Sequence, residues 1–143
     1  MLNVSEFESV KAIQEIPKHP VRRKGDLPMT HYMNLNASPF EMIKCGVKTI
    51  ELRLFDEKRQ VLAVNDSIVF TMTDDPSQQI TVKVKALHLF SSFEELYAEL
   101  PLENCGYTKE ELPAASYKDM EQYYSQEKQT KYGVVGIEIQ LAN

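Results

Sequence analysis

The segment from His31 to Phe55 reads HYMNLNASPFEMIKCGVKTIELRLF. Apolar and polar residues alternate at both of its ends, which predicts one strand at Thr30–Asn36 and a second at Thr49–Phe55. Between these strands, Ser38 has the position of an N-cap before a proline, and Gly46 follows a helical pattern of about two turns. The segment therefore predicts a strand, a short helix and a strand in direct succession.

Three further strands are predicted downstream of this segment. They are SIVFTM at 67–72, QITVKVKALHLF at 79–90 and VVGIEIQL at 134–141, each rich in β-branched or aromatic residues. Turn-forming residues at 56–60 follow the strand at Thr49–Phe55, and those at 74–77 separate the strand at 67–72 from the strand at 79–90. We therefore expect the strands at 49–55, 67–72 and 79–90 to form a meander of neighbouring strands.

Helices are predicted mainly in the last third of the chain. The stretches Ser92–Glu95 and Thr108–Glu111 have the Ser/Thr-x-x-Glu form of a capping box, and the tyrosine-rich stretch at 116–128 looks helical. A chain of 143 residues is long enough to bury about 68–70% of its unfolded surface without disulfides or a metal. The sequence thus predicts an α+β fold: a curled sheet or small β-barrel of about five or six strands, with short helices packed around it.

The first 28 residues are expected to lie outside this unit. A capping box at Ser5–Glu8 precedes apolar residues at helical spacing, which predicts a short helix that ends at Pro17. The stretch that follows, IPKHPVRRKGDLP, contains three prolines and reads as an extended connector. We divide the chain into an N-terminal helix with a Pro-rich connector at 1–28 and a barrel domain at 29–143.

Several classes of protein are excluded by what the sequence lacks. The two cysteines form no CxxC pair and the three histidines lie far apart, so no metal site and no cofactor are expected. No stretch approaches 18 consecutive apolar residues, and the N-terminus has no basic start followed by an apolar run. We expect a cytoplasmic protein with reduced thiols and no membrane association.

Charge is unevenly distributed along the chain. Nine basic and five acidic residues lie between Lys18 and Arg59, whereas Ser91–Lys128 contains nine acidic residues and three lysines. The formal net charge of −5 argues against a protein that coats nucleic acid through many phosphate contacts. The basic stretch can face an anion, and the acidic stretch is either a solvated face or a docking surface for a basic protein partner.

The stretch GVKTIELR at 46–53 concentrates chemically versatile side chains. Glu51 and Arg53 lie on one face of the predicted strand because they are two residues apart, and Lys48 leaves the preceding turn. An arginine can bind a phosphate or carbonyl through two hydrogen bonds, and a glutamate can accept from an amine or transfer a proton. On spacing alone, the alternative is a ladder of weak ion pairs on a solvated strand face.

This stretch resembles the G-x-K-x-x-E-x-R signature of the ASCH domain family, a branch of the PUA-like β-barrels. The flanking sequence, the later FSSFEELYAELPLENCGYTKEEL and the terminal GVVGIEI are also similar to that family, so the resemblance extends from about Thr30 to Leu141. It implies a mixed β-barrel with a cleft between barrel and helices. Gly46 would permit the turn, and Lys48, Glu51 and Arg53 would line a cleft that binds RNA or a modified nucleoside.

One bacterial branch of the family implies a different function for the same site. Its members are small amidohydrolases that remove the acetyl group from N4-acetylcytidine, using a lysine, a threonine three residues later and a distant glutamate. Here Lys48 matches the lysine, Glu51 replaces the threonine, and Glu103 is the nearest counterpart of the distant glutamate. The alternative function is therefore deacylation of an N4-acetylcytidine-like nucleoside, in which Glu51 or Glu103 activates water.

Two residues of the first strand and several tyrosines complete the set of candidates. His31 and Asn34 are candidate ligand-binding residues, although local hydrogen bonding is an equally good explanation for each. Three tyrosines can stack on a base or can be packing residues of a half-buried helix. They are Tyr123, Tyr124 and Tyr132.

Overall fold

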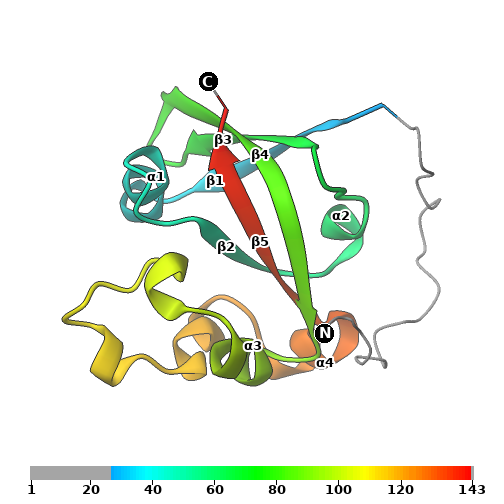
Figure 1. The fold of residues 1–143 in the computed structure, drawn as a ribbon. Helices are drawn as coiled ribbons and strands as arrows, with labels where there is room; N and C mark the ends of the chain where they lie inside the picture. Colours follow the sequence, from blue (N-terminus) through cyan, green and yellow to red (C-terminus); the bar gives the residue numbers. More distant parts are fainter. Residues whose placement is uncertain (1–26, 143) are drawn as a thin grey trace.

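The computed structural model describes residues 27–142 (Figure 1). Five strands form one curled mixed sheet in the order β1-β3-β4-β5-β2. The strands are β1 (Thr30–Leu35), β2 (Ile50–Leu54), β3 (Ser67–Met72), β4 (Asp75–Phe90) and β5 (Val134–Leu141). β1 and β3 run parallel, and the other neighbouring strands are antiparallel. The predicted N-terminal helix and most of the predicted connector lie outside the described residues.

Short helices surround this sheet. They are α1 (Ala37–Lys44), α2 (Glu57–Gln60), α3 (Phe93–Glu99) and α4 (Gln126–Tyr132), with the 3₁₀ helices η2 (Leu102–Cys105), η3 (Leu112–Ala114) and η4 (Tyr117–Gln122). Figure 1 shows α3, α4 and the 3₁₀ helices as a layer below the sheet, with α1 and α2 at opposite ends of it. The prediction of an α+β fold, with a barrel-like sheet and short helices around it, is confirmed.

The predicted meander of β2, β3 and β4 is wrong. β3 and β4 form a hairpin, but β2 pairs with β5 at one edge of the sheet and β3 pairs with β1 near the other. The connection between β2 and β3 contains α2 and carries the chain from one edge of the sheet to the far side. Alternation of apolar and polar residues reports which face of a strand is buried and does not report its neighbour, so the sequence pattern could not give this pairing.

The helix predictions hold in part. Ser92 caps α3 as predicted, accepting a hydrogen bond from the Glu95 amide at 3.2 Å. Thr108 and Glu111 also exchange the two capping-box hydrogen bonds, at 2.9 and 3.2 Å, yet only a turn and the short η3 follow. Pro113 lies within η3 and provides no amide proton for a continuing helix.

Two further helix boundaries differ from the prediction. α1 begins two residues early, with Asn36 and not Ser38 at the N-cap, because a proline is tolerated anywhere in the first turn, where its missing amide proton is not needed. The helix predicted at 116–128 is divided into η4 and α4. The break lies at Tyr123–Ser125, and Ser125 caps the second helix.

Two hydrophobic clusters stabilise the fold. The first fills the inside of the curled sheet under α1, and its fully buried members include Phe40, Ile68 and Phe70. The second joins β2 and β5 to α3 through Ile50, Phe93, Leu96 and Val134, among others. This second cluster fixes the helical layer against β2, the strand that carries the signature residues.

Candidate functional site

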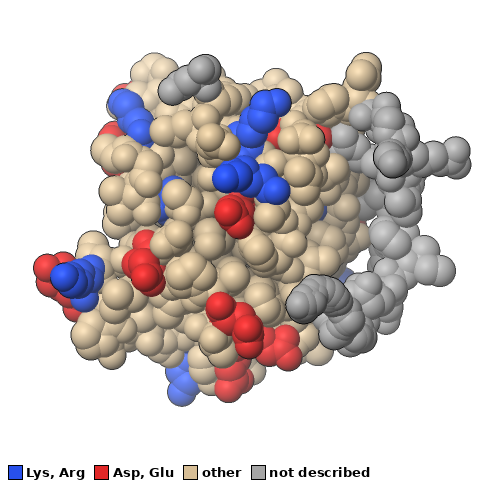
Figure 2. Space-filling model, viewed as in Figure 1, with Lys and Arg blue, Asp and Glu red and all other residues tan. Residues whose placement is uncertain are grey.

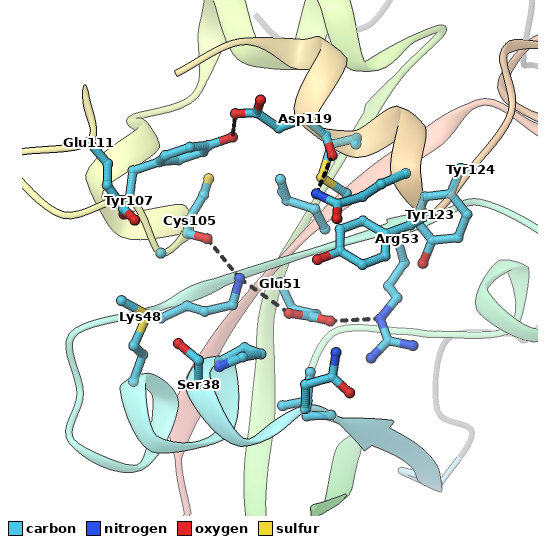
Figure 3. A pocket seen from close by; sticks show the side chains of 18 of the residues that line it. Ser38, Lys48, Glu51, Arg53, Cys105, Tyr107, Glu111, Asp119, Tyr123 and Tyr124 are labelled. Carbon is cyan, nitrogen blue, oxygen red and sulfur yellow. Dashed lines mark hydrogen bonds and ion pairs between the residues drawn. The ribbon is translucent and has the colours of Figure 1, made fainter. Parts of the chain in front are cut away.

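A cavity of about 490 Å³ lies between α1, β2 and the helical layer (Figure 3). Its volume is within the range of small-molecule sites, about 300–1,000 Å³. The side chains that line it come from β1, α1, β2, α3, η2 and η4, which are far apart in the sequence. The lining includes Lys48, Glu51 and Arg53, so the fold places all three of these signature residues at one cavity.

These three residues form a buried ion-pair group at the floor of the cavity. Glu51 accepts from Arg53 Nε through Oε2 at 2.7 Å, and its Oε1 lies 3.3 Å from Lys48 Nζ. Lys48 Nζ also donates to the backbone oxygen of Cys105 at 2.7 Å, and Arg53 Nη2 donates to the backbone oxygen of Asn34 at 2.8 Å. The alternative of a solvated ladder of ion pairs does not apply, because the side chains of Lys48, Glu51 and Arg53 are only 8%, 7% and 13% exposed.

The electrostatics of this group favour the charged forms of Glu51 and Arg53. Burial on its own raises the pKa of Glu51, but Lys48 and Arg53 together lower the pKa below its ordinary value. Burial lowers the pKa of Arg53, and the Glu51 carboxylate more than offsets this and raises it. The floor of the cavity therefore presents two cations held in place by one shared carboxylate.

Two glycines in left-handed conformations position Lys48. Gly46 has a φ of 81° just after α1, and the Val47 amide then bonds back to the Met42 carbonyl at 2.9 Å, which ends the helix and directs the chain into β2. Gly106 has a φ of 113°, and a Cβ there would lie 3.4 Å from Lys48 Cδ. Gly106 therefore forms a close wall over the lysine stem.

Substitution of these glycines should reduce stability to different degrees. We expect Gly106→Ala to lower the free energy of unfolding by about 2 kcal/mol and Gly46→Ala by about 1 kcal/mol, since only glycine adopts positive φ without a steric penalty. The larger effect belongs to Gly106 because its φ of 113° is farther from the left-handed helical region that other residues tolerate. Urea unfolding of both variants measures this, and equal stability of Gly106→Ala and the wild type would contradict it.

A hydrogen-bonded chain of tyrosines forms the wall opposite the floor. Tyr97 on α3 and Tyr107 join their hydroxyl groups at 2.7 Å. The Tyr107 hydroxyl donates to Asp119 Oδ2 on η4 at 2.6 Å (Figure 3). Burial raises the pKa of Tyr97 to about 12, and burial together with the bond to Asp119 raises the pKa of Tyr107. Both hydroxyl groups therefore stay protonated and tie three segments of the helical layer together.

Tyr123 and Tyr124 supply an aromatic side of the cavity. Tyr124 stacks on Phe93 with ring centroids 5.9 Å apart and an interplanar angle of 20°. The Tyr123 ring contacts the Tyr124 ring at a tilt of 55°, with centroids 6.4 Å apart. Tyr123 remains 59% exposed and can contact a ligand. An exposed aromatic ring beside polar groups is typical of sites that stack a planar base.

Of the other residues that the sequence suggested for the site, the structure places only some at the cavity. Asn34 lines the cavity, and Gly46 lies in the turn before β2 without lining it. Glu103 is exposed on η2 and is not among the lining residues. Tyr132 packs against the cluster between β2 and α3.

His31 lies on the opposite face of β1 from Asn34. It is 8% exposed, and its Nε2 is 2.8 Å from Oδ2 of the fully buried Asp66. Asp66 also accepts from the backbone amides of Met29 and Ala63, each at 3.0 Å. The structure thus places His31 in a buried network that fixes the start of β1, away from the cavity.

Several residues that line the cavity were not identified from the sequence. Tyr97, Tyr107 and Asp119 come from segments without strong periodicity, and Ser38 was interpreted only as a helix cap. Cys105 lies near Lys48, and burial raises the pKa of its thiol to about 11, so it is not a thiolate nucleophile at neutral pH. The reciprocal pair Ser116 and Asp119, a capping box, was the one local signal that could have placed Asp119 at a helix start.

The described residues contain neither a metal-binding cluster nor a membrane-spanning helix. Within residues 27–142, no group of three or more His, Cys, Asp or Glu side chains is arranged to hold a metal ion. No helix in the part of the chain that the structure describes has both the length and the apolar character needed to cross a membrane.

Comparison with known proteins identifies the family. A model of the ASCH domain matches residues 33–142, and the chain therefore belongs to the ASCH family. This confirms the resemblance on which the sequence analysis relied. ASCH domains share the PUA-like fold and have been proposed to bind RNA.

Solved structures similar to this chain include PH0355, PF0455 and a mutant of ZmASCH. The hypothetical protein PH0355 is 37% identical with a TM-score of 0.67, and the match covers 80% of this chain and 100% of that one. PF0455 from Pyrococcus furiosus is 35% identical with a TM-score of 0.60, covering 80% of this chain and 99% of that one. A point mutant of ZmASCH from Zymomonas mobilis is 13% identical with a TM-score of 0.56, over 78% of this chain and 67% of that one, and bears on the fold alone. No curated protein matches.

Proposed function

We propose that this protein binds an RNA base or a modified nucleoside in the cavity above the Lys48–Glu51–Arg53 group. The observation that carries the proposal is that two buried cations, held by one carboxylate, face a cavity flanked by the exposed ring of Tyr123. Cations supply strong donors to a base carbonyl, and the ring supplies a stacking surface. Together they provide the two kinds of contact by which a single base is recognised.

Both cations retain donors for a ligand. Lys48 Nζ uses one proton on the Cys105 carbonyl and a second toward Glu51, which leaves a third. Among the described residues, Arg53 Nη1 makes no hydrogen bond, so two of its N–H groups are also available. A carbonyl oxygen of a ligand could accept from the remaining donors of Lys48 or Arg53 while Glu51 stays paired with both.

The geometry supports binding better than hydrolysis. Glu51 is engaged by both cations, and its lowered pKa makes it a weak general base. Glu103 is exposed outside the lining, and the protonated thiol of Cys105 is a poor nucleophile. Deacylation by Lys48 with Glu51 or Glu103 would therefore need a rearrangement of the floor.

Replacing Lys48 should weaken ligand binding strongly. We expect Lys48→Met to reduce affinity for N4-acetylcytidine or cytidine by about 10- to 100-fold, because a hydrogen bond from a charged donor contributes about 1.5–3 kcal/mol. Lys44→Met is the matched control, since Lys44 is an exposed lysine of α1 that does not line the cavity. Calorimetric titration of both variants measures the difference.

Equal affinities for the two variants would contradict the proposal. The same samples test the alternative function, by incubation with N4-acetylcytidine and chromatographic detection of cytidine. Release of cytidine by the wild type, lost in Lys48→Met, would replace binding with amidohydrolase chemistry as the function of this cavity.

A further inference from the structure

The rim of the cavity differs in charge from its floor. Seven of the lining residues are exposed and form the rim, and they are Asn34, Asn36, Ser38, Thr73, Glu111, Gln122 and Tyr123. Within residues 27–142, no lysine or arginine belongs to this rim, and its one charged member is Glu111. The rim therefore offers amides, hydroxyl groups and one carboxylate to an incoming ligand.

The cations of the cavity are both at the floor and already paired. Lys48 and Arg53 share Glu51, and the other charged lining residues are the acids Glu111 and Asp119. Two positive and three negative groups thus face the same space. Any phosphate in this cavity would approach more carboxylates than cations.

The surroundings reinforce this imbalance. The stretch 91–128, which forms most of the helical layer, has nine acidic residues and three lysines. Figure 2 shows most of the acidic atoms on the visible face over this layer, and the largest basic patch over the sheet. On the nearby α2, Arg59 pairs with Asp56 at 3.2 Å. Lys58 is exposed outside the lining, where partial desolvation and the charges of Arg59 and Arg53 lower its pKa, and it is the basic side chain of α2 that could still attract a phosphate.

We propose that the cavity is selective for an uncharged, unphosphorylated nucleoside and disfavours nucleotides and polynucleotides. The inference rests on the proposed function and selects among its ligands. A polynucleotide is held mainly through phosphate contacts with lysine and arginine, and the rim supplies neither. A neutral nucleoside needs only a carbonyl at the floor, an aromatic face for its base, and amide or hydroxyl partners for its ribose.

Titration calorimetry with matched ligands tests this selectivity. The probes are cytidine and N4-acetylcytidine, their 5′-monophosphates, and a short oligocytidylate. We expect each nucleoside to bind at least about tenfold more tightly than its monophosphate, which carries a charge of about −1.5 to −2. Raising the ionic strength from about 0.01 M to about 1 M should narrow this gap, because salt screens the repulsion.

Two charge-reversal variants test whether the discrimination against the monophosphate arises at the rim. Glu111→Lys should raise the affinity for the monophosphate, relative to the affinity of the same variant for the nucleoside, by about tenfold. Glu110→Lys is the matched control, because Glu110 is an exposed neighbour outside the lining and its replacement changes the net charge equally. Glu111→Gln, which retains an oxygen to accept from the Thr108 amide, should give a smaller change in the same direction.

The outcomes separate this inference from the proposed function. Tighter binding of the monophosphate or oligocytidylate than of the nucleoside would overturn the selectivity and leave base binding intact. Identical effects of Glu111→Lys and Glu110→Lys would also overturn it, because the rim would then have no special role. Binding of none of these probes would overturn the proposed function and this inference with it.

Discussion

Glu51→Ala should lower the free energy of unfolding by about 3–5 kcal/mol, the effect expected when one partner of a buried ion pair is removed. The reason is that Glu51 is the shared counter-ion of Lys48 and Arg53, and all three side chains are almost fully buried. Without it, two like charges remain close together in a poorly solvated site. Urea unfolding at pH 7 measures the loss.

A triple variant distinguishes the effect of losing the ion pairs from the effect of losing side-chain volume. Replacing Lys48, Glu51 and Arg53 together by Met, Leu and Met should recover much of the stability, because an apolar group of similar volume leaves no buried charge unpaired. Recovery will be incomplete, since Arg53 also donates to the Asn34 carbonyl. A Glu51→Ala protein within about 1 kcal/mol of the wild type would contradict the account of the floor.

The difference in stability between the wild type and Glu51→Ala should depend on pH in a defined direction. The pKa of Glu51 in the folded protein is below the ordinary value of 4.5, so its contribution to stability is present in full above that value. As the pH falls through the lowered pKa, the carboxylate becomes protonated and the contribution is lost. The wild type and Glu51→Ala should therefore converge in stability at acid pH and not at alkaline pH.

Asp66→Ala should destabilise the protein to a comparable degree, by about 3–5 kcal/mol. Asp66 is fully buried and accepts from two backbone amides and from His31 at 2.8 Å. Its loss leaves the buried His31 ring and two part-buried backbone amides without this acceptor at the start of β1. Denaturant unfolding measures the effect.

Asp74→Ala is the control for this prediction, because Asp74 is an exposed acid in the turn between β3 and β4. Its replacement should change stability by less than about 0.5 kcal/mol. Similar behaviour of the two variants would show that the Asp66 network adds nothing beyond a surface charge.

The sequence predicted the strands well because alternation follows directly from strand geometry. Alternation puts His31, Met33 and Leu35 on one face of β1, and the structure shows that this face is the buried one. The same pattern could not show that the polar face of β2 is buried too, since Glu51 is covered by the helical layer from a distant part of the chain. Strand pairing was missed for the same reason: it depends on contacts between segments far apart in sequence.

The cavity was predictable on one side only. Lys48, Glu51 and Arg53 are close in sequence and carry a family signature, so local spacing placed them together. Tyr107 and Asp119 come from irregular turns and 3₁₀ helices, where no periodic pattern indicates which way a side chain points. The tertiary fold alone brings them to the opposite wall.

Arg53 links the architecture to the proposed function. It spans the gap between the two edge strands of the sheet by donating to the Asn34 carbonyl, and its remaining N–H groups face the cavity. A ligand that binds Arg53 therefore contacts the residue that joins β1 to β2. Variants of Arg53 will lose this link between β1 and β2 together with affinity, whereas Lys48→Met keeps both the link and the Arg53–Glu51 pair.

The most direct test is a two-dimensional NMR titration of the protein with cytidine and N4-acetylcytidine. We predict that saturable shifts concentrate on the amide signals of Lys48, Arg53, Gly106 and Tyr123, which surround the cavity. Saturable shifts confined to another face, such as the exposed side of β4 around Lys83 and Lys85, would contradict the assignment of this cavity as the binding site.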